Sequence, residues 1–396
     1  DRQLHVFSVG VEGGEPVNLT AGTGLELPRP AVQLLSALYD ISPDGTELAF
    51  VADTDPAVNN TNLDVYTVAI GGKDATNRSA SNPADDGEPR YSPDGRWLAF
   101  AQQRTPGFYG DISRLMLIDR RSGAVREVAG GGQAATAMVA CQRLGLKTRY
   151  VGKTGGGDFG DYSRRSLELA GVDTEGVSVV PDARNQCAFV LIDDRTGERT
   201  IIWDRDQRLV MHPREVPRDI IGSAKVLLLD GHDAAAAVQA ARFARDEGMP
   251  VVMDAERISE ETAELVSLSD VVIGERHFPE RFTGCADLKD ALRQIAGRGP
   301  RVTGVTLGKE GALALYDGRF SHSPAYEVAC RDTTGAGDVF HAAFIRALFE
   351  DWDLARCLAF SNAVAALKCR DLGGRAGLPT FDEAGTSMKS GTSGAG

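Results

Sequence analysis

The sequence contains no run of about 18 apolar residues, the length that a helix needs to cross a bilayer. It has no basic segment followed by an apolar one at its start, and it begins with Asp1 rather than Met, so any leader is either absent or already removed. Because 42% of the residues are hydrophobic and 25% are charged, the composition is typical of a soluble globular protein. We therefore expect no membrane partner.

Paired cysteines and an excess of positive charge are also missing. None of the six cysteines belongs to a C-x-x-C pair, so neither a zinc site nor a disulfide framework is indicated, and a reducing cytoplasm is the expected location. Lys and Arg number 43 against 56 Asp and Glu, which gives a net charge of -13. A general nucleic-acid binder needs a basic face that displaces counterions, so nucleic acid is not an expected partner.

One internal repeat is present. Residues 41–50 recur as residues 91–100, with the pattern Ser-Pro-Asp-Gly followed after two residues by Leu-Ala-Phe. The first four residues predict a tight turn, because Pro fixes φ and Gly tolerates a positive φ, and the last three predict a short strand. Further strands are expected at residues 4–9, 63–68 and 115–118, which together predict four-stranded antiparallel units.

These repeats resemble the β-propeller blades of TolB-like proteins and of the propeller domains of prolyl-oligopeptidase-type peptidases. The resemblance covers residues 1–122 and about two blades, whereas a closed propeller needs about 4 to 8. A peptidase would also need a G-x-S-x-G pentapeptide, which the sequence lacks. We expect an all-β partial-propeller scaffold that packs as a small sheet unit against the second domain or is loosely ordered, and that does not close a ring.

A second domain is expected over residues 123–384, followed by a flexible Gly/Ser-rich tail at residues 385–396. In this domain helical and strand patterns alternate, which predicts an α/β fold with a doubly wound, mainly parallel sheet covered on both faces. Ligands of such sheets gather at the carboxyl ends of the strands. Helices are predicted at residues 134–144, 161–170, 234–247 and 288–297, and strands at residues 149–151, 188–193, 198–203, 225–229, 251–254, 271–273 and 302–307.

The clearest chemical signal is the string D-T-T-G-A-G-D at residues 332–338, which opens an apolar helix. A glycine-rich turn at a helix start presents backbone N–H groups and a positive helix end to an anion. Gly335, Ala336 and Gly337 could therefore stabilise charge on a transferred phosphoryl group, while Asp338 accepts a proton from the attacking hydroxyl. Taken alone, such a turn is more often only a tight connection between elements.

The whole string resembles the second signature of the ribokinase (PfkB) family of carbohydrate kinases. The resemblance implies a ribokinase-like fold and transfer of the γ-phosphate of ATP to a hydroxyl of a sugar or sugar acid. It makes Asp338 the catalytic base and the amides of residues 335–337 the anion hole. In this family the first Asp and the second Thr often hold a monovalent cation such as K⁺, so Asp332 and Thr334 are candidates for that role.

Two further segments and one further residue match motifs of the same family, in the family's order. Residues 306–311 resemble the T-x-G-x-x-G turn, in which small residues let ATP phosphates lie close to the backbone. Residues 131–133 resemble the first signature, G-G-N, whose residues contact the sugar, although Gln133 stands where Asn is usual. The resemblance assigns ATP binding to Thr306, Gly308, Gly311 and Asn362, and substrate binding to Gly131, Gly132 and Gln133.

Two departures from the family pattern affect the expected chemistry. The family's N-x-x-E element, which organises magnesium through water, is replaced by residues 274–277, so either Glu275 substitutes or Mg²⁺ is held mainly by the ATP phosphates. The family's first strand, which carries a substrate-binding Asp, and its lid strands have no counterpart before Gly131. Only residues 124–128 resemble the last lid strand.

Three functions therefore remain open. The first is the sugar or sugar-acid kinase described above, with ATP and a sugar-like molecule as its partners. The second keeps the chemistry but uses a nucleoside or a vitamin-like alcohol as the acceptor. The third is a non-catalytic fusion in which the propeller-like segment binds a partner and the kinase domain is a relic. For each of these three functions, a homodimer is a possible assembly.

Overall fold

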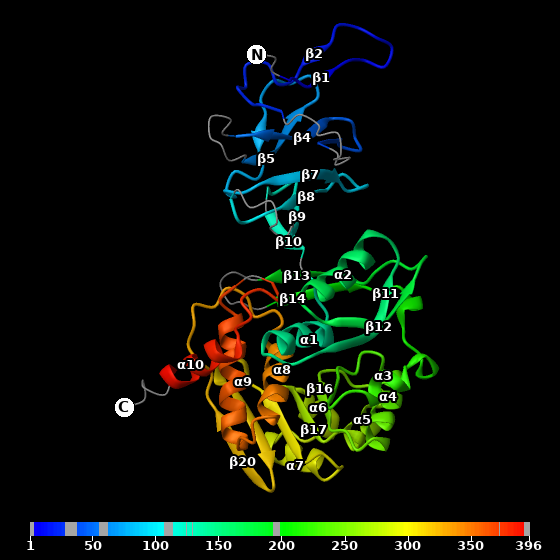
Figure 1. Ribbon diagram of the computed structural model, residues 1–396, viewed down its shortest axis with the longest axis vertical. Helices are drawn as coiled ribbons and strands as arrows, with labels where there is room; N and C mark the ends of the chain where they lie inside the picture. The colour runs from blue at the N-terminus through cyan, green and yellow to red at the C-terminus, as the bar shows by residue number, and fades with distance from the viewer. Residues whose placement is uncertain are drawn as a thin grey trace. The chain divides into compact units, whose positions relative to one another are not determined.

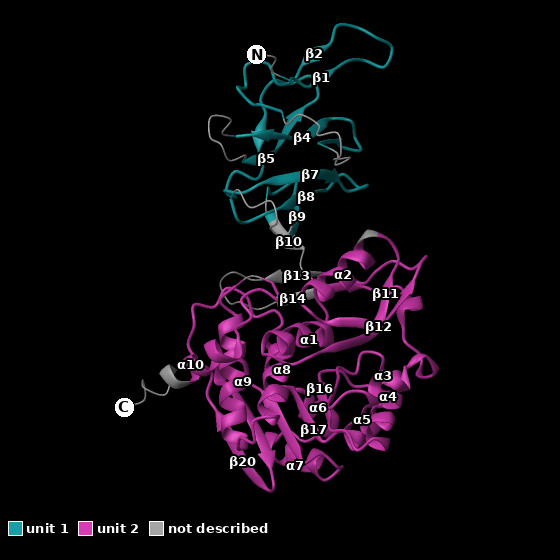
Figure 2. Ribbon diagram, viewed as in Figure 1, with its two compact units in different colours: residues 1–129 teal, residues 130–396 magenta. Residues whose placement is uncertain are grey.

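The chain folds as two compact units, residues 1–129 and residues 130–396, which are coloured separately in Figure 2. The computed structural model describes residues 4–27, 38–54, 62–106, 114–123, 125–128, 130–192, 199–371 and 373–391. None of the helices in these ranges is long and apolar enough to cross a membrane. Both units contain β-sheets, but the two units differ in the direction of paired strands and in how far apart paired strands lie in the sequence.

Unit 1 is built from small antiparallel sheets, and its described residues form no helix (Figure 1). A two-stranded sheet pairs β1 (Phe7–Ser8) with β2 (Val17–Asn18). The first four-stranded sheet contains β3 (Tyr39–Ile41), β4 (Glu47–Asp53), β5 (Leu63–Ala69) and β6 (Thr76–Asn77). The second contains β7 (Asp86–Tyr91), β8 (Trp97–Gln102), β9 (Arg114–Asp119) and β10 (Val125–Val128). In both four-stranded sheets each strand pairs with its neighbours in sequence.

The repeated Ser-Pro-Asp-Gly segment forms the same turn in both sheets. In the first copy, Ser42 Oγ donates to Asp44 Oδ1 at 2.6 Å and accepts from the amide of Glu47 at 2.9 Å. The chain reverses at Gly45, which adopts a φ of 69° that favours glycine. Ser92 makes the equivalent pair of hydrogen bonds in the second copy. The side-chain bonds explain why serine and aspartate recur with the turn residues.

The first four-stranded sheet is covered on both faces. Leu48 and Phe50 of β4 pack with Leu19 on one face, and Ala49 packs with Phe100 of the second sheet on the other. This alternation along β4 is the period of two that a strand imposes on its side chains. The two four-stranded sheets therefore share a hydrophobic core within unit 1.

The structure corrects the predicted start of the second domain. Residues 124–128, which resemble a kinase lid strand in sequence, include β10, which pairs with β9 in the second sheet of unit 1. The turn at Gly123 causes this pairing, because its amide donates to the carbonyl of Asp119 at 2.7 Å and its φ is 72°. The boundary between the units lies between Ala129 and Gly130 rather than between residues 122 and 123.

Unit 2 contains a six-stranded sheet in the order β15-β16-β17-β18-β19-β20. Its parallel strands are β15 (Leu227–Leu229), β16 (Val251–Ala255), β17 (Val271–Glu275) and β18 (Val302–Thr306). The hairpin of β19 (Ala312–Tyr316) and β20 (Arg319–Ser323) adds two antiparallel strands at one edge. The prediction of a mainly parallel α/β sheet is confirmed.

Helices cover both faces of this sheet. Val251 and Met253 of β16 face a core that includes α4 (Ala234–Asp246) and α5 (Thr262–Leu268). Val252 faces the opposite core, which includes α1 (Gln133–Arg143), α8 (Ala336–Leu348) and α9 (Leu354–Lys368). Figure 1 shows α8 and α9 side by side. The remaining helices are α2 (Gly157–Leu169), α3 (Arg218–Gly222), α6 (Phe278–Thr283), α7 (Leu288–Ala296) and α10 (Phe381–Gly391), with short 3-10 turns at Gln207–Leu209, Pro213–Glu215 and Gly308–Glu310.

Two strand pairs stand apart from the six-stranded sheet. Strand β11 (Arg149–Gly155) pairs in parallel with β12 (Asp173–Val180), and β13 (Cys187–Ile192) pairs with β14 (Arg199–Asp204). Within the described residues neither pair shares a ladder with β15, and no strand of unit 2 precedes α1. Strands β12, β19 and β20 and helices α3, α5 and α6 were not predicted from the sequence.

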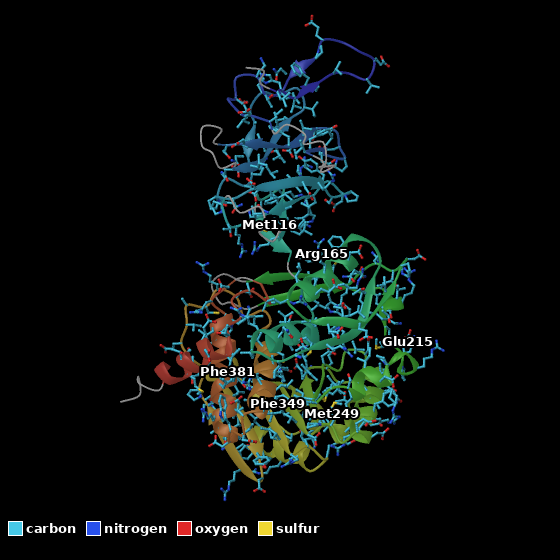
Figure 3. All side chains as sticks on the ribbon, viewed as in Figure 1. Met116, Arg165, Glu215, Met249, Phe349 and Phe381 are labelled. Carbon is cyan, nitrogen blue, oxygen red and sulfur yellow. The ribbon has the colours of Figure 1, made fainter. Side chains whose placement is uncertain are left out.

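The predicted flexible tail is wrong at its beginning, because α10 continues through residues 385–391. A capping interaction starts this helix: Glu383 Oε2 accepts from the Thr380 amide at 2.7 Å, and Thr380 Oγ1 accepts from the Glu383 amide at 3.3 Å. Phe381, labelled in Figure 3, packs against Phe360 with ring centroids 5.3 Å apart. Met388 packs against the same core, so tertiary contact overrides the low helix propensity of the Gly and Ser residues.

Candidate active site

The predicted site residues come from both ends of unit 2 and gather around two helix starts. Gly131 to Gln133 lead into α1, and Gly335 to Asp338 lead into α8. Both helices lie on the same face of the six-stranded sheet, where they share one core with β16 and β17. Topology thus brings together segments about 200 residues apart in the sequence.

The start of α8 depends on glycine at residue 335. Gly335 is the N-cap, with a φ of 78°, and a Cβ there would lie 2.7 Å from the carbonyl oxygen of Gly374. Its carbonyl accepts the first helical bond, from Val339, at 2.9 Å. The amide of Ala336, one of the three in the predicted anion hole, already donates to the carbonyl of Thr333 at 3.1 Å. A Cβ at Gly337 would meet nothing within 4 Å.

Asp338 lies in the first turn of α8 and is partly buried. Its charge acts on the guanidinium of Arg375, the group that joins the two helix starts. Arg375 donates to the carbonyl of Gly131 at 2.9 Å and to Ser166 Oγ at 3.1 Å, while its Nε is buried without a partner in the described part of the chain. Burial lowers the pKa of Arg375. Sequence reasoning missed this residue, although it lies in the Gly-Gly-Arg-Ala-Gly segment near the carboxyl end.

A buried histidine connects α8 to the sheet. His341 Nδ1 lies 2.8 Å from the carbonyl oxygen of Gly337, and Nε2 lies 3.1 Å from that of Ile273. Carbonyl oxygens only accept, so both bonds form together only in the imidazolium, whose charge Asp254 Oδ2 can balance from 3.7 Å. Burial raises the pKa of Asp254 to about 6, and the charge of His341 opposes that rise. No sequence motif signalled this pair.

The loop before α8 encloses a second buried carboxylate. Asp332 accepts from the amide of Thr334 through Oδ1 and from the amide of Gly373 through Oδ2, both at 2.8 Å. Burial disfavours the charged form, yet these hydrogen bonds and the charge of Lys368 hold the pKa of Asp332 below its ordinary value. The structure thus brings together Asp332 and Thr334, the two predicted cation ligands, and adds Lys368 beside them.

The predicted ATP turn and Asn362 converge on one segment. Gly308 and Gly311 have φ values of 60° and 93°, and a Cβ at Gly311 would overlap the carbonyl oxygen of Ser323. Asn362, on α9, donates to the carbonyl oxygens of Ser323 at 2.9 Å and Pro324 at 3.2 Å. Thr306 closes β18 next to this turn. Gly311 and Asn362 therefore both adjoin the segment at Ser323 and Pro324.

The two groups predicted for substrate and magnesium already have protein partners. Gln133 Nε2 donates to Glu256 Oε2 at 2.5 Å, at the carboxyl end of β16. Glu275 pairs with Arg281 at 2.7 Å and accepts from the amide of His277 at 2.8 Å. Among the described residues, no group of three or more His, Cys, Asp or Glu side chains could hold a metal ion. A divalent ion here would need ligands from the nucleotide.

A cavity of about 360 Å³ lies where β15 ends and α4 begins. Its polar wall is the Arg205–Asp233 pair, joined by two hydrogen bonds of 2.8 Å, and its aromatic wall is Trp203 and His232. Arg257, one residue after Glu256, also lines it and lies 5.1 Å from the centre of the Trp203 ring. Sequence reasoning missed this cavity, although the polar run Asp-Gly-His-Asp directly follows the buried strand β15.

A mainly parallel sheet, a glycine-rich helix start and an acidic residue in its first turn are features that an α/β small-molecule kinase requires. The sequence model of the pfkB family of carbohydrate kinases matches residues 119–381. The chain belongs to this family, and it is a kinase.

The chain is 30% identical over 259 residues to a nucleoside kinase of Methanothermobacter thermautotrophicus, a match covering 64% of this chain and 82% of that protein. It is 31% identical over 258 residues to an ATP-dependent ribose-1-phosphate kinase of Halopiger xanaduensis, covering 64% and 84%. A ribokinase of Arabidopsis thaliana, solved with ribose and ATP, matches with a TM-score of 0.59 at 24% identity, covering 67% of this chain and 89% of that one. This last likeness supports the fold alone.

Proposed function

We propose that this kinase transfers the γ-phosphate of ATP to a hydroxyl group of a sugar or sugar acid. The observation that carries the proposal is the start of α8, where the open backbone at Gly337 adjoins Asp338 in the first helical turn. Asp338 takes the proton of the acceptor hydroxyl as that oxygen attacks phosphorus. The amides of residues 335–337 stabilise the charge on the phosphoryl group.

ATP lies against the turn formed by Thr306, Gly308 and Gly311, and phosphates can approach the backbone at Gly308, where a Cβ would meet nothing within 4 Å. Magnesium, when bound, neutralises charge on the β- and γ-phosphates. The phosphates supply most of its ligands, because Glu275 is held by Arg281 and by the amide of His277. The protein's own task on this side is therefore to position the nucleotide.

The acceptor occupies the side of Gly131, Gln133 and the cavity at the end of β15. Gln133 is joined to Glu256, and the next residue, Arg257, lines the cavity, so the two features are contiguous. The Arg205–Asp233 pair and His232 offer donors and acceptors for sugar hydroxyls. Arg375 fixes the Gly131 backbone relative to Asp338, which aligns the acceptor with the base.

A nucleoside is the second candidate acceptor, and one observation favours it. The rings of Trp203 and His232 lie 6.0 Å apart at 59° on the cavity wall, and 45% of Trp203 is exposed. An exposed indole offers a flat face on which a nucleobase can stack. One of the relatives above is described as a nucleoside kinase.

The test is a panel of sugars, sugar acids and nucleosides, each assayed for acceptor-dependent ADP release by the full chain. A sugar or sugar acid as the best acceptor supports the first proposal, and a nucleoside supports the second. Trp203→Ala separates them further, because loss of stacking should raise KM for a nucleoside much more than for a sugar. If no acceptor stimulates ADP release although magnesium-ATP binds, the proposal is overturned in favour of a relic kinase domain.

For unit 1 we infer a scaffold role without chemistry, as a two-blade relative of propeller repeats. The inference rests on the two four-stranded antiparallel sheets, their shared turn, and the core between Ala49, Val65, Leu98 and Phe100. It predicts that substitutions in these turns change the stability of unit 1 and leave turnover unchanged.

A further inference from the structure

Lys368, the last residue of α9, is wholly buried. Its Nζ donates to the backbone carbonyl oxygen of Asp332 at 2.9 Å. A buried ammonium is costly unless its charge is compensated, and lysine is almost never fully buried without a partner. Two compensating features are present: the Asp332 carboxylate, whose pKa its charge lowers, and the negative end of α9.

Lys368 acts on the segment that leads into the anion hole. The amides of Arg331 and Asp332 donate to the carbonyl of Cys369 at 2.8 and 3.2 Å, which holds this segment against the end of α9. Asp332 then fixes the Thr334 amide, and the carbonyl of Thr333 accepts from Ala336. A continuous series of bonds therefore runs from the Lys368 ammonium to the first turn of α8.

The residues around Asp332 fit a resident monovalent cation poorly. Both carboxylate oxygens of Asp332 already accept backbone N–H groups, and its carbonyl accepts from Lys368. A second cation beside a buried ammonium would be repelled in a site of low dielectric. Among the side-chain oxygens of this loop, Thr334 Oγ1 is the one that is buried without a partner in the described part of the chain, and one hydroxyl cannot replace the hydration shell of K⁺.

We propose that Lys368 supplies the fixed positive charge of this loop, so that the kinase needs no monovalent cation. Lys368 is a positioning residue: through Asp332 it sets the geometry of the amides at residues 335–337. The expected effect of Lys368 on turnover rests on the proposed function. Its role as the positive charge of the loop does not. Two measurements therefore separate the two ideas.

The first measurement needs no acceptor. The thermal midpoint and magnesium-ATP binding of the wild-type chain are measured in KCl and in choline chloride at equal ionic strength. A resident K⁺ site would raise the midpoint in KCl by mass action, and we expect no difference between the salts. A K⁺-specific rise in the midpoint, or ATP binding that depends on K⁺, would overturn the proposal even if no acceptor is ever found.

The second measurement uses Lys368→Met, which keeps the length of the side chain and removes its charge, and Lys147→Met, an exposed lysine, as its control. We expect Lys368→Met to lower kcat by about tenfold or more, with K⁺ or NH₄⁺ restoring part of the loss, and Lys147→Met to change nothing. Lys368→Arg, which retains a charge, should keep more activity than Lys368→Met. If Lys368→Met folds and turns over like the wild type without K⁺, the proposal is wrong, and if it fails to fold, the salt comparison still decides.

Discussion

Contacts between residues close in the sequence organise unit 1, whereas contacts between residues distant in the sequence organise unit 2. In unit 1 every strand of the two four-stranded sheets pairs with its neighbour in sequence, and the turns are closed by side chains two and five residues apart, such as Ser42, Asp44 and Glu47. In unit 2 the parallel strands are separated by helices, and the bond from Arg375 to Gly131 spans 244 residues. Chemistry gathers in the second unit because parallel topology brings distant loops to one edge of the sheet.

Asp86 of unit 1 contrasts with the buried carboxylates of the site in unit 2, although Asp119 of unit 1 is buried and pairs with Arg96. In unit 1, Asp86 is 2% exposed; its Oδ1 accepts from Asn82, and its Oδ2 has no partner within the described segments. In unit 2 each buried carboxylate of the site faces a cation: Asp254 faces His341, and Asp332 faces Lys368. A buried carboxylate without a cation is a cost to the fold, whereas a paired one can fix the geometry of a site.

The largest effect should come from Asp338→Asn. The amide keeps the size of the side chain but cannot take the hydroxyl proton, so kcat should fall by about 10²–10⁴-fold while the thermal midpoint stays within a few degrees of the wild type. Steady-state ADP release and calorimetry measure the two quantities. Asp351→Asn is the matched control, because residue 351 is exposed, has a φ of 51° that Asn tolerates, and lies outside the site. Wild-type turnover in Asp338→Asn would remove Asp338 from the role of base.

Substitutions of two nearby glycines of unit 2 should have different effects, one on ATP binding and the other on stability. A Cβ at residue 337 would meet no atom within 4 Å outside the adjacent backbone of its own helix, so we expect Gly337→Val to fold and its Kd for magnesium-ATP to rise by about tenfold or more. Gly335→Ala instead forces a φ of 78° on alanine and brings its Cβ to the Gly374 carbonyl, so it should lower the thermal midpoint. Titration calorimetry and thermal unfolding distinguish them. Unchanged ATP affinity in Gly337→Val would show that the phosphate does not lie at this helix start.

The sequence allowed prediction of whatever depends on local chemistry. The Ser-Pro-Asp-Gly turns and the helix that follows residue 338 were predicted because turn residues and a glycine-rich helix start leave short, specific patterns. Lys368 and the His341–Asp254 pair were not predicted, because each reads as an ordinary residue of its own element. Their roles arise from partners 36 and 68 residues away in the chain, in the bonds to Asp332 and Ile273. These contacts depend on the tertiary fold and not on the local sequence.

Asp86 and Asp254 should differ in how their replacement by the uncharged Asn changes stability. Burial raises the pKa of Asp86 to about 7 from 3.8, with the nearby Asp64 carboxylate adding to the rise. The contribution of Asp86 to stability is therefore full below about pH 4 and is lost as the pH rises through about 7. Ionisation of Asp86 above about pH 7 therefore destabilises the fold.

Asp86→Asn should remove this cost and raise the unfolding temperature of unit 1 at pH 8.5, with little change at pH 5. Asp254→Asn should stabilise unit 2 less than Asp86→Asn stabilises unit 1 at pH 8.5, because the charge of His341 opposes the rise in the pKa of Asp254. Hydrogen exchange of β8 and of β16 in the full chain reports on the two units separately. A destabilised unit 1 in Asp86→Asn at pH 8.5 would show that the carboxylate of Asp86 is paired after all.

The smallest effect should come from the repeated turns, where the two copies serve as controls for each other. Ser42→Ala removes the acceptor of the Glu47 amide and the donor to Asp44, and we expect a loss of about 1–2 kcal/mol of stability in unit 1. Ser92→Ala removes the same bonds from a partly exposed serine, so water can replace them and the loss should be about half as large. Hydrogen exchange of β4 and of β8 in the full chain measures both losses. Because the turns contribute only local order to unit 1, kcat should equal that of the wild type in both variants, and a change in kcat would show that unit 1 takes part in catalysis.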